Sequence, residues 1–246
     1  MNEQLLLENI RGVLVRQEET IIFSLIERSQ FRRNERVYAP GGFGPAVGAD
    51  NLTGYLLHRT EIIHAGMRRY TSPDEHPFYN DLPEPVLPRL RFDENPLHPN
   101  RVNLNPRIRA AYESELVPLL CRPGDDQQYG STAVCDVACL QALSKRIHYG
   151  MFVAEGKYRQ EEAAFAGMIA DGDCAALRQA ITDAAVEAAV LDRVERKART
   201  YSQEVAGEGG ADLPDRVRQV YERWVIPLTK DVEVEYLLAR RALRHG

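Results

Sequence analysis

The feature that most constrains this chain is the helical spacing of its apolar residues, which recurs along most of its 246 residues. In residues 4–33, apolar side chains recur three or four positions apart, and charged residues fill the positions between them. No stretch of useful length alternates apolar with polar residues, as a half-buried β-strand would, and no segment repeats. The pattern predicts an all-α protein: a single large multi-helix domain over residues 1–246, with long helices and no significant β-sheet.

Length, charge and cysteine content exclude several other classes of protein. A chain of 246 residues can bury a substantial core. Its net charge of −5 and pI near 5.8, without a dense run of Lys or Arg, argue against nucleic-acid binding. No run approaches the roughly 18 apolar residues of a membrane span, and the opening MNEQLLLENI does not resemble a signal peptide. The four cysteines lack a disulfide or zinc spacing, so buried free thiols in a reducing, cytoplasmic location are expected.

The same spacing predicts seven more helices after the first. They span about 51–71, 105–120, 131–158, 160–170, 173–181, 183–203 and 214–243. Asp50 or Asn51 is expected to cap the helix over 51–71. Asn105, followed by Pro106, is a good N-cap and first-turn pair for the next helix. Pro227 falls inside the last helix and predicts a kink there, and residues 204–212 are expected to form a flexible loop.

The stretch from about 72 to 106 holds eight of the chain's 14 prolines. Proline removes a backbone donor and fixes φ, so this stretch cannot be regular helix or a central strand. Two interpretations stay open. The stretch is either a long ordered excursion packed over the helical body or a disordered linker.

The segment 143–158 (LSKRIHYGMFVAEGKY) carries a pair of cations with a helical relationship. Arg146 and Lys157 are eleven positions apart, which is only about 20° past three full turns, with roughly 16 Å between them along the axis. Both side chains are long, so their heads can converge on a small dianion. This requires that Gly150 does not break the helix. The alternative is a pair of surface cations that share no ligand.

Other polar residues interrupt the apolar pattern of the helices. Thr229 and Glu233 are four positions apart and therefore share a face. Glu187 lies among small apolar residues, and Arg11 directly follows the apolar position Ile10. Each of these residues alone is typical of a solvated helix face. No nucleophile elbow, phosphate-binding glycine loop or metal-binding signature occurs, so an enzyme with this sequence would work by positioning and electrostatics, without a covalent step or a metal.

Five ordered stretches carry a resemblance to a known family. They are NIRGVLVRQEETIIFSLIERSQF at 9–31, RRYTSPDEHPFY at 68–79, YGSTAVCDVACLQALSKRIHYGMFVAEGKY at 129–158, AAVE at 184–187 and VIPLTKDVEVEYLLARR at 225–241. Over nearly its whole length the chain resembles the all-α chorismate mutases of fungi and plants. The resemblance implies conversion of chorismate to prephenate by a [3,3] Claisen rearrangement, in phenylalanine and tyrosine biosynthesis, with neither cofactor nor metal.

The resemblance also implies a role for each candidate residue. Arg11 and Arg146 would bind the substrate carboxylates, and Lys157 would donate to the ether oxygen. Thr229 and Glu233 would lie on the other side of that oxygen. The acid that bonds the ring hydroxyl falls on Glu187. The family's Asn one turn earlier is Asp183 here, which adds a negative charge near a dianionic substrate.

The resemblance further implies a homodimer with an effector site between its subunits. Tyrosine and tryptophan are the effectors expected. The matching positions are Arg68, Arg69, Gly130 and Ser131, while Val134 stands where the fungal pattern has Thr. Two alternatives stay open: a catalytically inactive dimeric sensor of aromatic amino acids, and a helical scaffold without a small-molecule site. Under that second alternative, Arg68 and Arg69 are only cations at a helix C-terminus.

Overall fold

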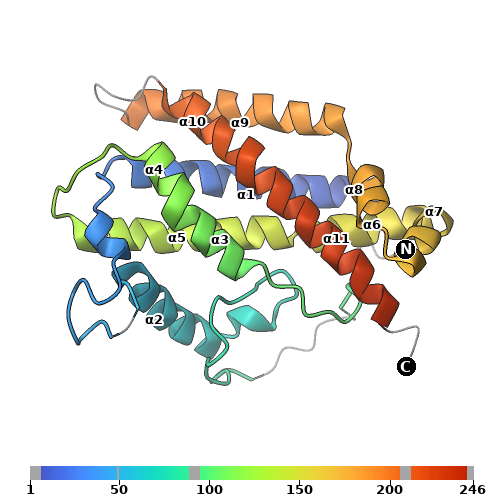
Figure 1. Ribbon diagram of the computed structural model, residues 1–246, viewed down its shortest axis with the longest axis horizontal. Coiled ribbons are helices and arrows are strands. Elements are labelled where there is room, and N and C mark those ends of the chain that lie inside the picture. The colour runs from blue at the N-terminus through green and yellow to red at the C-terminus, as the bar shows by residue number, and fades with distance from the viewer. Residues whose placement is uncertain (1–6, 49, 89–94, 206–211, 243–246) are drawn as a thin grey trace.

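The computed structural model describes residues 7–48, 50–88, 95–205 and 212–242 (Figure 1). Within these ranges every regular element is a helix and none is a strand, which confirms the all-α prediction. None of the described helices is long and apolar enough to cross a membrane. Figure 1 shows the longest helices side by side, with the last helix crossing in front of them.

Helix α1 (Leu7–Ser29) is the central element of the bundle. It packs against α5 (Tyr129–His148) on one side and α9 (Ala184–Val205) on another. Its predicted apolar stripe is buried: Ile10, Ile21 and Leu25 are almost inaccessible to solvent. The helix ends about four residues before the predicted position 33, and the predicted start at residue 4 lies outside the described residues.

A buried ion pair explains why α1 ends where it does. Arg28, at the end of the stripe, pairs with Asp136 of α5 through Nε at 2.7 Å, and both side chains are fully buried. Its Nη atoms donate to the backbone carbonyls of Arg32 and Arg33, which wraps the chain around the guanidinium. The Asp136 carboxylate also accepts three hydroxyl donors, from Tyr38, Thr53 and Tyr112.

Helix α2 (Leu52–Gly66) begins at the predicted cap but ends early. The Asn51 side chain accepts a hydrogen bond from the backbone N–H of Gly54, as an N-cap should. The helix was expected to continue to about Thr71. Instead it stops at Gly66, Arg68 adopts a left-handed conformation (φ 68°), and a short 3₁₀ turn covers Arg69–Thr71.

The described parts of the proline-rich stretch, 72–88 and 95–104, contact the helices at several points, which supports the ordered interpretation for these residues. The buried carboxylate of Glu61 on α2 accepts the backbone N–H groups of Phe78 and Tyr79. The His76 ring stacks on His148 of α5 at 4.3 Å between centroids, and His148 Nε2 accepts the N–H of Leu104. Residues 89–94 lie outside the described ranges.

Two long helices contain a π turn just before a proline. The first comprises α3 (Asn105–Ala111), the π turn Tyr112–Leu116 and α4 (Val117–Leu120). The second comprises α10 (Leu213–Val220), the π turn Tyr221–Val225 and α11 (Ile226–Ala242). Each π turn ends two residues before a proline, Pro118 or Pro227. A proline ring crowds the carbonyl four residues earlier, and the wider turn accommodates it.

Most of the remaining helix boundaries agree with the predictions to within about two residues. Asn105 is the first helical residue rather than the cap; its side chain donates to the carbonyls of His76 and Pro77. Helices α7 (Glu162–Asp171) and α8 (Cys174–Ile181) lie close to their predicted positions. The predicted loop over 204–212 begins after Val205, and 206–211 lie outside the described residues, as does the predicted helix end at 243.

The predicted helix over 131–158 is interrupted at one residue. Helix α5 ends at His148 and α6 (Gly150–Gln160) begins two residues later. Tyr149 between them stays right-handed, with φ −61° and ψ −13°. Figure 1 shows α6 continuing along the line of α5. The segment therefore keeps its direction, which the predicted alignment of Arg146 with Lys157 requires.

The cysteine prediction is right in part. All four thiols are free, and Cys121 and Cys139 are buried. Cys135 is half-buried and Cys174 is exposed, contrary to the expectation that all four lie in the core.

Candidate active site

Arg146 and Lys157 both reach the same short segment of α11. The Nη1 atom of Arg146 donates to Thr229 Oγ1 at 3.4 Å, and Lys157 Nζ lies 3.3 Å from Glu233 Oε2. Thr229 and Glu233 are one helical turn apart, so the two cations converge despite their separation along α5 and α6. The structure thus brings together four of the six candidate residues.

Gly150 sets how closely α11 approaches this face. A Cβ atom at Gly150 would lie 3.0 Å from both Thr229 Cγ2 and the Thr229 carbonyl oxygen, and 3.3 Å from Glu233 Cγ. Nine in ten real Cβ contacts are longer than these, so any larger side chain at this position would push α11 away by a few tenths of an ångström. Sequence reasoning treated Gly150 as a threat to the helix, whereas the structure uses it to bring two helices together.

Burial controls the electrostatics of the site. Arg146 is only 6% exposed, and burial lowers its pKa while Tyr221, Glu18 and Glu233 oppose that shift. Its Nε atom is buried and has no hydrogen-bond partner among the described residues. A buried, unpaired guanidinium N–H is a costly arrangement that a bound anion would relieve.

Glu233 is 5% exposed, and burial raises its pKa. The charges of Lys157, Arg146 and Lys230 oppose that shift, but the net direction is upward. Lys157 Nζ also donates to the backbone carbonyl of Ile181 at 2.5 Å, which anchors the ammonium at the end of α8. Because burial outweighs the neighbouring cations and raises the pKa of Glu233, its carboxyl group keeps a proton more readily than an exposed glutamate and can then act as a hydrogen-bond donor.

A second ion pair, between Glu18 and Arg193, acts on the charge of Arg146 and was not predicted from the sequence. Glu18 of α1 is 1% exposed and accepts two bonds from Arg193 of α9, at 2.5 and 2.8 Å. The Tyr221 hydroxyl in the π turn is buried without a hydrogen-bond partner in the described part of the chain. The helical spacing could have indicated that Glu18 is buried, because it lies four positions before Ile22, which is fully buried, and therefore on the same face of α1.

Glu187 and Asp183 lie at the start of α9. Glu187 is paired with Lys230 of α11, with 2.6 Å between Nζ and Oε1. Asp183 caps the helix: its Oδ1 accepts the backbone N–H groups of Ala185 and Val186. The helix N-terminus favours this negative charge. The Asp183 carboxylate, which stands where the family has Asn, is therefore bonded to the N-terminus of α9.

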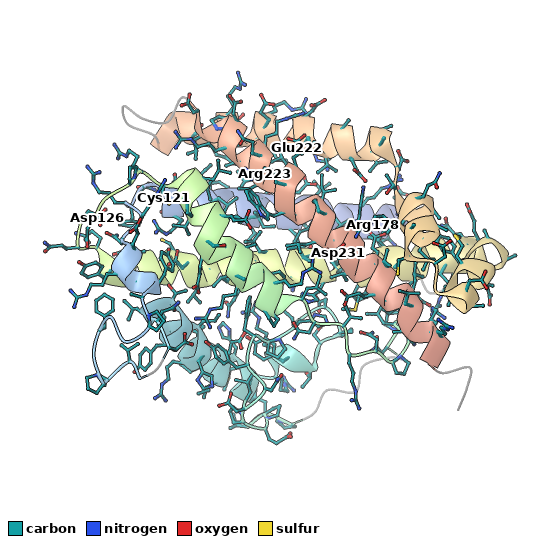
Figure 2. All side chains as sticks on the ribbon, in the orientation of Figure 1. Cys121, Asp126, Arg178, Glu222, Arg223 and Asp231 are labelled. Carbon is teal, nitrogen blue, oxygen red and sulfur yellow. The ribbon has the colours of Figure 1, made fainter. Side chains whose placement is uncertain are left out.

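Ion pairs connect the face of α11 that points away from Arg146 and Lys157 to two other helices. Asp231 pairs with Arg107 of α3 and with Arg178 of α8, and Figure 2 shows Arg178 and Asp231 close together on the near side of the bundle. This clamp holds α8 against α11, and α8 supplies the carbonyl that anchors Lys157. Among the described residues, no three His, Cys, Asp or Glu side chains are grouped as ligands for a metal ion.

Comparisons with known proteins agree with this geometry. The family model for chorismate mutase type II matches residues 128–234. A chorismate mutase from Schizosaccharomyces pombe is 48% identical over 98% of this chain and 98% of its own length. The chain belongs to the chorismate mutase family.

Two solved chorismate mutase structures show the same fold. AtCM1 with tyrosine bound in its allosteric site is 45% identical, with a TM-score of 0.87, covering 97% of this chain and 98% of that one. The enzyme from Candida albicans in complex with L-Trp is 38% identical, with a TM-score of 0.89, covering 97% and 92%. The resemblance to the fungal and plant chorismate mutases is thereby confirmed over nearly the full length.

Arg11, the second carboxylate-binding arginine that the chorismate mutase resemblance implies, is not joined to the other residues. It lies exposed near the start of α1. Its guanidinium makes no hydrogen bond or ion pair to the described residues of the site. Its role in binding substrate stays a prediction.

The residues expected to form the effector site fall into two separate groups within one chain. Arg69 bonds Glu75 and Gln141, and the Arg68 guanidinium donates to the carbonyl of Pro88. Gly130 and Ser131 are exposed at the start of α5, about ten positions before Gln141, which is roughly 15 Å along the helix axis. Val134, one turn into α5, is 59% exposed. One chain of this chorismate mutase fold does not bring these groups together.

Proposed function

We propose that this chain binds chorismate between α5–α6, α9 and α11 and rearranges it to prephenate. The observation that carries the proposal is the buried guanidinium of Arg146, whose Nε has no hydrogen-bond partner among the described residues, close to Lys157, Thr229 and Glu233. A carboxylate is the expected partner for such a group, because guanidinium and carboxylate match in bidentate geometry. The reaction is intramolecular: one ether C–O bond breaks, one C–C bond forms, and no other reactant is needed.

The rate enhancement would come from positioning and from charge stabilisation. Freezing the enolpyruvyl side chain over the ring in a chair-like conformation removes much of the entropic barrier. As the C–O bond breaks, negative charge grows on the ether oxygen. Lys157 would donate to that oxygen from one side, and a protonated Glu233 from the other. Both interactions strengthen in the transition state, so they lower the barrier rather than only tightening substrate binding.

The other predicted residues would bind and orient the substrate. Thr229 fixes the Arg146 guanidinium, and its hydroxyl donates to the Val225 carbonyl at 2.6 Å. Glu187 would accept the ring hydroxyl of chorismate through its second carboxylate oxygen. Asp183 would act indirectly, by capping the helix that carries Glu187. Arg11 would turn inward to bind the second substrate carboxylate.

Regulation by aromatic amino acids is part of the proposal. Tyrosine occupies the allosteric site of AtCM1, and the Candida albicans enzyme was solved with L-Trp. We place the corresponding site between two copies of this chain, with Arg68 and Arg69 of one copy facing the start of α5 in the other. The separation of the two groups within one chain supports that arrangement. The N-terminus of α5 favours a carboxylate.

A homodimer follows from the same placement. Ile63 and Met67 at the end of α2 are 66% and 53% exposed, and Val86 is 75% exposed. The N–H of Val86 bonds the carbonyl of Gly66, so these apolar side chains surround one helix end, next to Arg68. Burying them against a second copy would remove apolar surface from water. We also propose a cytoplasmic location, which suits four free thiols.

The direct test is to add purified protein to chorismate and follow the loss of chorismate absorbance together with the appearance of prephenate. We expect turnover without added metal or cofactor. Arg146→Met is the matched negative control, because it removes the buried guanidinium and keeps a side chain of similar length. An absence of turnover together with tight binding of tyrosine or tryptophan would favour the inactive sensor, and neither activity would favour the scaffold.

A further inference from the structure

Lys230, the residue after Thr229 on α11, was not a candidate residue in the sequence, but in the structure it pairs with one of the candidates, Glu187. Its Nζ lies 2.6 Å from Oε1 of Glu187, and the two side chains are 18% and 29% exposed. The pair therefore bridges α11 and α9 at the edge of the buried site. Lys230 also lies near the buried Glu233, whose pKa is raised by burial and lowered in turn by Lys157, Arg146 and Lys230.

The pair leaves half of the Glu187 carboxylate available. A carboxylate has two oxygens, each able to accept hydrogen bonds. Lys230 occupies Oε1, and within the described part of the chain no second side chain bonds to this carboxylate. Partly exposed ion pairs contribute little to stability, so a stability role alone does not account for a lysine at this position.

We propose that Lys230 is a positioning residue for Glu187: it holds Oε1 and thereby directs Oε2 toward the ring hydroxyl of bound chorismate. The inference rests on the proposed role of Glu187 as the acceptor of that hydroxyl. A free glutamate side chain samples several rotamers, and fixing one of them costs conformational entropy. The ion pair to Lys230 already fixes the Glu187 rotamer in the free enzyme, so substrate binding does not have to.

The test is a double-mutant cycle in steady-state kinetics with chorismate. The variants are Lys230→Met, Lys230→Arg, Glu187→Gln and the double variant Lys230→Met with Glu187→Gln. We expect Lys230→Met to lower kcat/KM roughly tenfold, mainly by raising KM. Lys230→Arg should restore most of the loss, because it keeps a cation that can hold Oε1. In the Glu187→Gln background, Lys230→Met should cause no further loss.

A second ion pair on α9 supplies the control. Arg199 and Glu195 are bonded at 2.8 Å, away from the residues of the site, and Arg199→Met should leave both kinetic constants unchanged. Thermal unfolding of each variant checks that the fold is retained. Equal losses from Lys230→Met in both backgrounds would overturn the positioning role and leave the role of Glu187 standing. Wild-type kinetics in Glu187→Gln would overturn both.

Discussion

The two ends of the α1–α5 pair each bury an arginine, and they use it differently. At one end, every nitrogen of Arg28 has a partner: Nε pairs with Asp136, and both Nη atoms bond to main-chain carbonyls. At the other end, Arg146 makes a long bond to Thr229, and its Nε has no partner within the part of the chain that the structure describes. Burial disfavours both charges. For Arg28 the carboxylate of Asp136 helps to reverse that effect and the pKa is raised, whereas for Arg146 the pKa is lowered.

Arg28 and Arg146 are the same residue type and are both buried, so neither property distinguishes the structural role of Arg28 from the ligand-binding role proposed for Arg146. The two arginines differ in whether the protein itself supplies an acceptor for each N–H group of the guanidinium. Glu18, whose charge acts on Arg146, is already paired with Arg193. The Arg146 guanidinium therefore keeps hydrogen-bonding capacity that a ligand carboxylate could use, whereas that of Arg28 is fully bonded within the protein.

The largest expected effect separates the two arginines by stability. Arg28→Met strands the buried Asp136 without its cation and should lower the free energy of unfolding by about 3–5 kcal/mol. Arg146→Met removes no partner from a buried carboxylate and should change stability by much less, while kcat/KM falls by at least about 100-fold. Urea unfolding and steady-state kinetics on both variants measure this contrast. Similar unfolding losses in the two variants would contradict it.

Lys157 tests the electrostatic part of the site. Lys157→Ala removes the donor to the ether oxygen and should raise the barrier by roughly 2.7–4 kcal/mol, by analogy with loss of an oxyanion-hole donor. The loss should fall on kcat rather than KM, because the charge develops only in the transition state. Single-turnover measurements with chorismate check this. Near-normal turnover would show that the proposed mechanism is wrong.

Gly150 tests the close approach of α11. In Gly150→Ala the new methyl group meets Thr229 and Glu233, and we expect a loss of about 1–3 kcal/mol in stability, together with reduced kcat. Gly167→Ala on α7 is the matched control, because its Cβ would meet nothing within 4 Å. That variant should be neutral or more stable by about 0.4–1 kcal/mol. Equal behaviour of the two alanine variants in thermal unfolding and kinetics would refute the packing role.

Glu233 gives a prediction about pH. The carboxyl can donate to the ether oxygen only while protonated, and burial raises its pKa. Activity should therefore be highest below that raised pKa and should fall as pH rises through it, by about tenfold per pH unit at the steepest. Glu233→Gln keeps a donor that does not titrate, so its profile of kcat against pH should be flatter. An unchanged profile in Glu233→Gln would exclude this role.

The smallest effect concerns effector choice. Val134 offers no hydroxyl at the start of α5 and is well exposed. In Val134→Thr, a new hydrogen bond to the tyrosine phenol is worth about 0.5–1.5 kcal/mol, so the response to tyrosine should shift by roughly two- to tenfold. Phenylalanine has no phenol hydroxyl and serves as the control. Titrating activity with both amino acids measures the difference; a shift of equal size for both would argue against a bond to the phenol.

The helical period made the fold and part of the site predictable from sequence. It predicted Arg146 and Lys157 on one face and Thr229 with Glu233 on another, and in the structure the two pairs are in contact. The period does not report which helices pack together or in what register. For this reason the pairing of Glu18 with Arg193, 175 positions apart, was missed.

Hydrogen bonds that cap a helix depend on residues close together in the sequence, whereas other features of the structure depend on contacts between helices, which the sequence does not reveal. The cap of α2 was predicted to be Asp50 or Asn51, and Asn51 is the residue that caps it. The capping bonds of Asp183 were not predicted, although they use only its own helix. The early end of α2 depends on Arg68 in a left-handed conformation, which an arginine does not signal. The close contact at Gly150 depends on another helix, so no local pattern could reveal it.

The π turn at Tyr221–Val225 changes the phase of the helix that carries the site. It accommodates one residue more than a regular turn would, so Thr229 and Glu233 face the pocket at an angle that an unbroken α-helix would not give them. If the same sequence were wound as an unbroken α-helix instead, everything beyond the turn would be rotated by about 100° relative to α10. Thr229 and Glu233 would then point away from Arg146 and Lys157, although no residue of the site had been altered. The length of this turn is thus as much a determinant of the pocket as the side chains that line it.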